Sequence, residues 1–295
     1  SLRSLLFRLQ GRLPYGTFKS SIFHSIREIR PLAGISAECS ASLYGFLKNE
    51  LGLTFTLSDP KTIYMPDYEE AKHDDFDISF YGSSYFRYPG RSDLHCLLVQ
   101  VYHQLNDHVD TQIAFSRDGI SWERPERRAI IPVGTTGNGD EGTAYAWSSG
   151  LVTLPDGDWG YLYGGSAGLH NDQETDKTKM GWARWRPHRL CGINADTAGH
   201  FTINTIQRTS NHLKLNYRCK PGGWITVELL RRAPSGAHAE VAPLEGFTFA
   251  ESDRMTGDSL DKIVTFDGNS DISGIGDTVA IRIKMFGAKL FAYTV

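Results

Sequence analysis

A meander of short strands that begins at about residue 76 constrains the fold more than any other feature. Segments 76–88, 94–103 and 110–116 are strand-like, and the turn sequences PGRS, QLNDH and RDGI follow them. Short strands at a spacing of about 8–12 residues, separated by turn residues, are typical of an all-β sandwich, barrel or propeller. The sequence therefore predicts an all-β chain from this point on.

The meander then begins a second time. Strands are expected at 143–154, 159–165 and 178–187, with the turn PDGD and a polar loop between them. Each of the two sets takes roughly 50–60 residues, a period typical of propeller blades. We therefore expect propeller blades over residues 66–189.

The pattern changes after residue 189. Segments 199–208, 212–219 and 224–232 alternate apolar and polar residues, as strands with one solvent-exposed face do. This alternation continues close to the last residue of the sequence. The segment 190–295 is therefore predicted to form a separate β-sandwich.

The first 65 residues differ from the rest of the chain. Apolar residues recur there at helical spacing, at positions Ile35, Cys39, Leu43, Phe46 and Leu47. Gly52 follows as a plausible end of the helix. We therefore expect residues 1–65 to form a partly helical N-terminal segment.

Composition and charge exclude several classes of protein. Hydrophobic residues make up 40% of the chain and charged residues 22%, as in ordinary globular proteins. The net charge of −3 creates no field that favours nucleic acid or an anionic membrane. No apolar run approaches the length of about 20 residues that spans a bilayer. We therefore expect neither nucleic acid nor a membrane as a partner.

The N-terminal stretch SLRSLLFRLQGRLPYG is basic and amphipathic, without the long apolar centre or cleavage site of a secretory signal. The chain opens on Ser1 rather than Met, which leaves room for a leader or a larger N-terminal portion. Both a cytoplasmic location and secretion with a missing leader stay open.

The four cysteines, Cys39, Cys96, Cys191 and Cys219, lie far apart with no C-x-x-C spacing. This spacing argues against a structural zinc site and against a disulfide-dense scaffold. Buried free thiols are the favoured interpretation, and two disulfide bonds are the alternative. We expect no metal and no cofactor.

Several segments together resemble a known family. FSRDGISWERP, AIIPVGTTGNGDEGTAYAWSSGLV and WGYLYGG resemble the five-bladed β-propeller glycosidases of the glycoside hydrolase family 32 and 43 type, which are β-fructosidase and arabinanase-like hydrolases. The tail GDSLDKIVTFDGNSDISGIGDTVAIRIKMFGAKLFAYTV resembles the small C-terminal sandwich of a group similar to the N-terminal domain of family 32. The resemblance covers about residues 75–295.

The resemblance implies an all-β fold, a partial or complete five-bladed β-propeller followed by a C-terminal β-sandwich, with a short helical N-terminal segment. Five blades take roughly 300 residues, and two or three are visible in the sequence. The resemblance is therefore to a member that is N-terminally incomplete.

The function that the resemblance implies is hydrolysis of a glycosidic bond of the fructo- or arabino-furanoside type by carboxylate acid–base catalysis. Its alternative is a non-catalytic carbohydrate-binding or structural relative. Glu141, after a glycine-rich turn and before a strand, is the first candidate for the general acid, and its neighbour Asp140 is the second. Asp77, at a strand start, is the candidate base or tuning carboxylate. Solvated turn or edge positions are the alternative for all three.

His170 stands in a loop after a Gly-Gly pair, where it could hydrogen-bond a sugar hydroxyl, and a surface loop is its alternative. The aromatic residues Tyr145, Trp147 and Tyr163 could form a stacking platform for a sugar, or pack as core between blades. The Asp118-Gly turn and Trp122 are expected to be structural, with Trp122 packed between blades.

Overall fold

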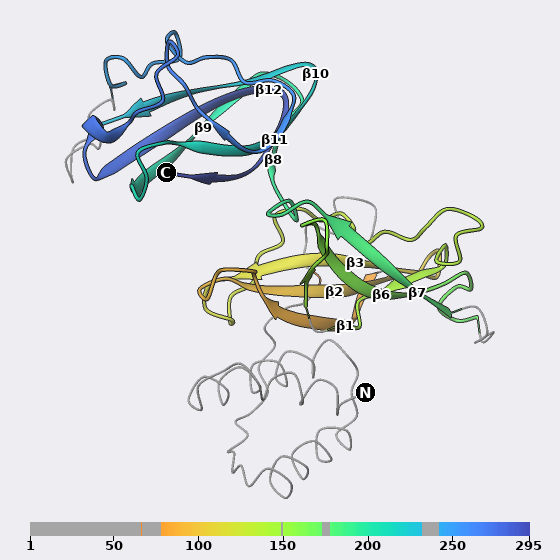
Figure 1. Cartoon of the computed structure of the whole chain (residues 1–295). Coiled ribbons are helices and arrows are strands. Elements are labelled where there is room, and N and C mark those ends of the chain that lie inside the picture. Colours follow the sequence, from red (N-terminus) through yellow and green to blue (C-terminus); the bar gives the residue numbers. More distant parts are fainter. Residues whose placement is uncertain (1–65, 67–77, 149, 173–177, 232–241) are drawn as a thin grey trace, which may run out of the picture. The chain divides into compact units, whose positions relative to one another are not determined.

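Figure 1 shows the computed structural model of the chain, in which residues 66, 78–148, 150–172, 178–231 and 242–295 are described. These residues belong to two compact units, here called unit 1 and unit 2, divided between Arg184 and Trp185. Within the described residues every regular element is a strand except the 3₁₀ turn η2 (Ser273–Ile275), which confirms the predicted all-β class. None of these residues belongs to a helix that is long and apolar enough to cross a membrane.

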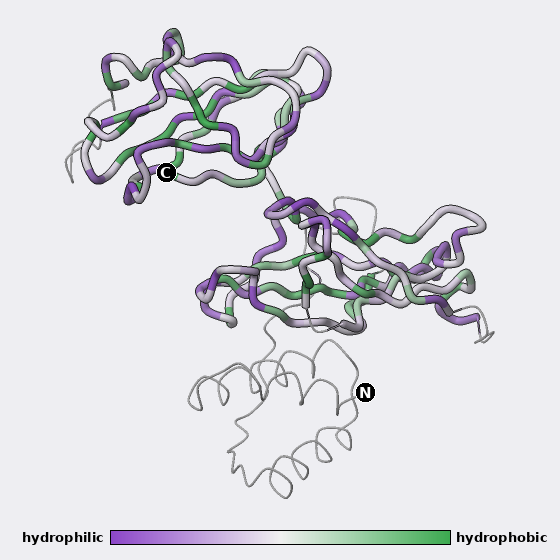
Figure 2. The backbone as a smooth tube through the Cα atoms, viewed as in Figure 1, coloured by the Kyte–Doolittle hydropathy of each residue, from purple (hydrophilic) through white to green (hydrophobic). Residues whose placement is uncertain are grey.

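The structure describes the predicted boundary between the two domains but not the predicted N-terminal helix. The helix expected in residues 1–65 lies outside the described residues. The division at Arg184 comes a few residues before the boundary expected at 189. Figure 2 shows hydrophobic stretches within the strands and hydrophilic stretches in the loops, as the alternating sequence pattern predicts.

Unit 1 is built on a seven-stranded sheet with the order β1-β2-β3-β4-β6-β5 and with β7 on the other side of β6. The strands are β1 (Ile78–Arg87), β2 (His95–His103), β3 (His108–Ser116), β4 (Thr143–Tyr145), β5 (Val152–Thr153), β6 (Trp159–Ser166) and β7 (Thr178–Trp185). The pairs within β1–β3 and within β4–β6 are antiparallel, whereas β3 and β4 share one parallel pair, Val109 with Thr143. Two antiparallel meanders are thus joined by very little backbone pairing.

Side chains of the first meander hold the strand that opens the second. Three buried polar residues, one from each of β1, β2 and β3, donate hydrogen bonds to three alternate carbonyls of segment 144–148. The pairs are Thr111 with Ala144 (Oγ1–O, 2.8 Å), Gln100 with Ala146 (Nε2–O, 3.2 Å) and Ser84 with Ser148. We call this arrangement the carbonyl ladder. It supplies the donors that a neighbouring strand would otherwise give to buried carbonyls.

The Asp-Gly turn after β3 folds as predicted. The Asp118 carboxylate accepts the backbone N–H groups of Ile120 (2.8 Å) and Ser121 (2.7 Å). The hydrogen bond from Ser121 and then that from Ile120 hold the pKa of Asp118 well below its usual range. Trp122 packs against the buried cluster that includes Val99 and Ala114 of this sheet, and its expected place between blades stays a prediction.

Unit 2 has a second sheet with the order β11-β10-β12, and β8 and β9 share the remaining edge of β12. The strands are β8 (Ile193–Ala195), β9 (Gly199–Gln207), β10 (Lys214–Leu230), β11 (Asp258–Ile263) and β12 (Thr278–Thr294). The long strands β10 and β12 bend around an apolar core (Figure 1) that includes Tyr217, Ile225, Ile283, Phe266 and Ile272.

A bulge explains why β10 is one strand where two were predicted. The pairing of β10 with β12 shifts between Cys219 and Trp224. Gly223 and Gly287 face each other there, because a Cβ on Gly223 would lie 2.3 Å from the Gly287 carbonyl oxygen. The glycines allow the two backbones to approach and the long strands to bend without ending.

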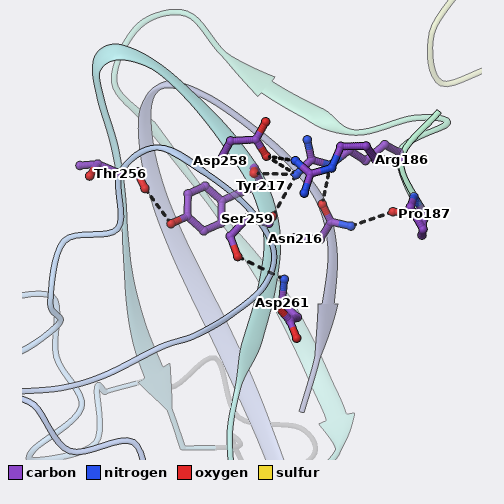
Figure 3. A network of polar contacts seen from close by, with 9 residues as sticks. Arg186, Pro187, Asn216, Tyr217, Thr256, Asp258, Ser259 and Asp261 are labelled. Carbon is purple, nitrogen blue, oxygen red and sulfur yellow. Dashed lines mark hydrogen bonds and ion pairs between the residues drawn. The ribbon is translucent and has the colours of Figure 1, made fainter. Parts of the chain in front are cut away.

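A polar network fixes the segment that enters unit 2 (Figure 3). The buried Arg189 guanidinium donates to the Asn216 side chain (2.8 Å), to the Asp258 carboxylate (2.5 Å) and to the carbonyls of Tyr217 and Ser259. Arg186 also contacts Asp258, at 2.6 Å. One arginine thus connects the entry segment to β10 and β11.

The described cysteines, Cys96, Cys191 and Cys219, form no disulfide bond. Burial raises the pKa of the Cys96 thiol to about 12, so this thiol stays protonated. Cys39 lies outside the described residues.

Candidate functional site

Two predicted platform residues stack on one face of the second meander. The rings of Tyr145 and Trp147 lie 5.4 Å apart with an interplanar angle of 14°. Tyr145 pairs with Gly164 of β6, and a Cβ on Gly164 would lie 3.1 Å from the Trp147 indole. The missing side chain of Gly164 therefore lets the indole lie directly on the strand. Trp147 is 59% exposed, so most of this ring faces solvent.

A second aromatic group adjoins the first. Tyr81 of β1, Tyr102 of β2 and His170 after β6 pack with ring centroids 4.5–5.1 Å apart. Burial, and next the Tyr81 hydroxyl, raise the pKa of Tyr145. We call Tyr81, Tyr102, Tyr145, Trp147 and His170 together the aromatic cluster.

Polar groups border the aromatic cluster. Asp107 accepts hydrogen bonds from the Tyr102 hydroxyl (2.8 Å) and from the backbone N–H of Asn171 (2.9 Å). Burial favours a higher pKa for Asp107, but the Asn171 backbone N–H and the Tyr102 hydroxyl outweigh it, so the net pKa is lowered. The carboxylate is therefore ionised at neutral pH, and it ties the loop after β2 to the loop after β6.

The Glu141 carboxylate turns into its own glycine-rich loop. Its two oxygens accept the backbone N–H groups of Gly137 (3.0 Å) and Gly139 (2.6 Å), residues with φ of 95° and 88°. These bonds, that of Gly137 first, lower the pKa of Glu141. A general acid must carry a proton at the working pH, whereas this arrangement keeps Glu141 ionised and supports the loop. The predicted role of Glu141 stays a prediction.

Asp140 points into a space left by glycines. Its Oδ2 accepts the Tyr163 hydroxyl at 2.6 Å, and its Oδ1 is buried without a partner among the described residues. A Cβ on Gly134 or on Gly165 would collide with the Asp140 side chain, at 1.8 and 2.4 Å. Burial and then the bond to Asp140 raise the pKa of Tyr163 to about 12, so Tyr163 remains a donor.

The structure therefore brings together part of the predicted site. Tyr145, Trp147 and His170 belong to the aromatic cluster. Tyr163 precedes Gly164 in β6 and so faces the other side of the sheet, toward Asp140. Asp77 lies outside the described residues.

Sequence reasoning missed Tyr81, Tyr102, Asp107 and Asn171. They come from β1, β2 and two loops, and they meet only through the sheet pairing, since Asp107 and Asn171 are 64 residues apart. The one local signal was the Gly-Gly pair near the end of β6, because a glycine opposite an aromatic residue marks a place where a ring can lie on the strand.

No group of three or more His, Cys, Asp and Glu side chains in the described part of the chain is arranged to hold a metal ion. Comparison of the chain with protein families, with curated proteins and with solved structures found no match in any of the three.

Proposed function

We propose that unit 1 binds carbohydrate at the aromatic cluster. The observation that carries this proposal is the stacked ring pair of Tyr145 and Trp147. Trp147 packs over Gly164 and is 59% exposed. Large aromatic faces that stay open to solvent suit the apolar C–H faces of sugar rings. A monomeric protein gains no stability from leaving such a ring exposed.

The polar border fits the same ligand. The carboxylate of Asp107 and the amide of Asn171 lie beside the Tyr102 ring, where they can accept from and donate to hydroxyl groups. Sites of this kind combine aromatic walls with a few placed polar groups. The ionised Asp107 disfavours an anionic ligand, so a neutral sugar is the expected class.

We further propose that the scaffold is the partial propeller and sandwich to which the sequence has resemblance. The two meanders of unit 1 would be two blades. Isolated bridges of Thr111 with Ile131 and of Phe115 with Glu123 support this, because they give the first meander the fourth edge that a blade needs. For unit 2, the packing of Met255, Val264 and Phe266 against the sheet supports a sandwich.

Hydrolysis of a fructo- or arabino-furanoside by Asp140, Glu141 and Asp77 is the second candidate. The observation in its favour is the buried Oδ1 of Asp140, which has no partner among the described residues. A buried carboxylate oxygen without a hydrogen-bond partner is rare in proteins and marks Asp140 as a candidate functional group. The ionised Glu141 favours the binding function over the catalytic one.

Binding is tested by isothermal titration of the full chain with fructo- and arabino-oligosaccharides. Trp147→Ala should abolish binding, and Tyr293→Ala, which removes a 39% exposed ring in unit 2, should leave it unchanged. Equal affinity of the Trp147→Ala variant and the parent chain would refute the site.

Hydrolysis is tested on the same sugars by release of reducing ends. Turnover that falls in Asp140→Asn and Glu141→Gln would favour the enzyme. Binding without turnover would exclude it for these substrates.

A further inference from the structure

We infer that the ligand is an extended neutral polysaccharide chain, and that Trp182 forms its second contact point. This inference rests on the proposed carbohydrate function. It concerns the face of β6 and β7 that continues from the aromatic cluster, and Trp182 was not among the residues expected to bind sugar.

Trp182 lies on β6 in the same way as Trp147. A Cβ on Gly160 would lie 2.9 Å from Leu154 and 3.1 Å from the Trp182 indole, and a Cβ on Gly164 would lie 3.1 Å from the Trp147 indole. The two glycines are four residues apart in one strand, so both indoles lie on one face. At about 3.3 Å per residue the two glycines are roughly 13 Å apart.

Both indoles are open to solvent. Trp182 is 52% exposed and Trp147 is 59% exposed. Met180, two residues before Trp182 in β7 and hence on its side of the strand, is 58% exposed. Within the described residues no arginine or lysine covers either indole, whereas Arg254 covers Trp224 of unit 2 at 5.0 Å.

The charged groups beside this face are paired with one another, and one arginine with two aspartates leaves a net charge of −1. Arg184 of β7 pairs with Asp156 and with Asp158 of the turn before β6. The face therefore offers apolar rings and paired polar groups, which fit a neutral ligand. A single sugar can cover one indole, but two indoles that contact glycines roughly 13 Å apart require several linked units.

The test is a length series of inulin-type fructo-oligosaccharides and α-1,5-arabino-oligosaccharides, from one to six units, titrated into the full chain. In the parent chain, affinity should rise with length until both indoles are covered. Trp182→Ala should lose about tenfold in affinity for the longest members, equivalent to about 1.4 kcal/mol. It should keep the parent affinity for the shortest members, and Trp182→Phe should restore most of the loss.

Four outcomes would overturn the inference. Affinity that is independent of length in the parent chain would leave the proposed function intact but exclude a polymer. A Trp182→Ala loss that is equal at all lengths would place Trp182 in a structural role. A dimer in sedimentation that Trp182→Ala abolishes would make the face a contact between copies. If no oligosaccharide binds at any length, both this inference and the proposed function fail.

Discussion

The two units of this chain differ in what lies over particular aromatic rings. In unit 2, Arg254 lies over Trp224, and Arg189 and Lys289 lie over Phe291. In unit 1, the indoles of Trp147 and Trp182 lie on glycines and have no cation over them among the described residues. A cation over a ring stabilises it and shields its face. The difference is that the rings of Trp147 and Trp182 are more than half exposed and carry no cation among the described residues.

The interiors differ as well. The core of unit 2 is a continuous apolar cluster between bent strands. The junction of the two meanders in unit 1 instead depends on the buried polar side chains of Ser84, Gln100 and Thr111. An apolar core tolerates substitutions that keep the hydrophobic volume, whereas a buried hydrogen bond is lost when one donor or acceptor atom is removed. The predictions below test this contrast.

The largest effect is expected from Arg189→Ala. The side chain is 7% exposed, and its loss leaves the Asn216 amide oxygen and two backbone carbonyls without their donor. We expect unit 2 to lose about 3 kcal/mol of stability, measured by urea unfolding of the full chain. Arg186→Ala is the matched control, because Arg186 is 42% exposed and should cost under about 1 kcal/mol. Equal losses in the two variants would contradict the network.

Gln100→Ala should cost about 2 kcal/mol in unit 1, because it leaves the Ala146 carbonyl buried without its donor. Urea unfolding followed by tryptophan fluorescence measures the loss. Gln104→Ala removes an exposed glutamine with one bond to Ser79, and it should cost under about 0.5 kcal/mol. The carbonyl ladder would be refuted if the Gln100 variant were as stable as this control.

Acid should weaken unit 2 through Asp258. The hydrogen bond from Arg189 is the main cause that lowers the pKa of Asp258 in the folded chain, against the opposing effect of burial. A lowered folded pKa gives stability that is present above the unfolded pKa of about 3.9 and is lost as the pH falls through the folded pKa. Asp258→Asn should therefore be less stable at pH 7, and the difference should shrink in urea midpoints taken toward pH 2. A constant difference would argue against the ion pair.

The smallest effect concerns Tyr163. Its pKa of about 12 reflects burial first and the bond to Asp140 second. Asp140→Asn removes the negative acceptor, so the pKa of Tyr163 should fall toward 10 but stay above it. Titration of ¹³C-labelled tyrosine by NMR, with Tyr163→Phe to assign the signal, measures this change. An unchanged pKa would mean that burial alone raises it.

The sequence was sufficient to predict the all-β class and most strands. The expected strands at 94–103, 110–116 and 159–165 match β2, β3 and β6 to within about two residues. These strands could be predicted because the alternation of apolar and polar residues and the turn residues between strands are local sequence signals. The apolar segment 129–133 contributes only a bridge at Ile131, since Pro132 has no backbone N–H to donate.

The site was less predictable for a physical reason. The aromatic types of Tyr145 and Trp147 were visible, but the position of Trp182 beside Gly160 depends on how β7 pairs with β6. The carbonyl ladder joins residues 33 to 64 positions apart through side chains that have many other partners in an unfolded chain. Such contacts follow from the fold and leave no periodic trace in the sequence.

The carbonyl ladder has a consequence for how the two meanders keep their alignment. Every second carbonyl of an extended segment points the same way, so a slip of segment 144–148 by two residues would present an equivalent row of acceptors. Tyr161 distinguishes the two alignments, because its hydroxyl (2.7 Å) and the Ser84 hydroxyl of the first meander donate to the same Ser148 carbonyl, and a slip would separate them. The Tyr161 hydroxyl thus helps to select one alignment of segment 144–148 with the first meander. Tyr161→Phe would remove this selection.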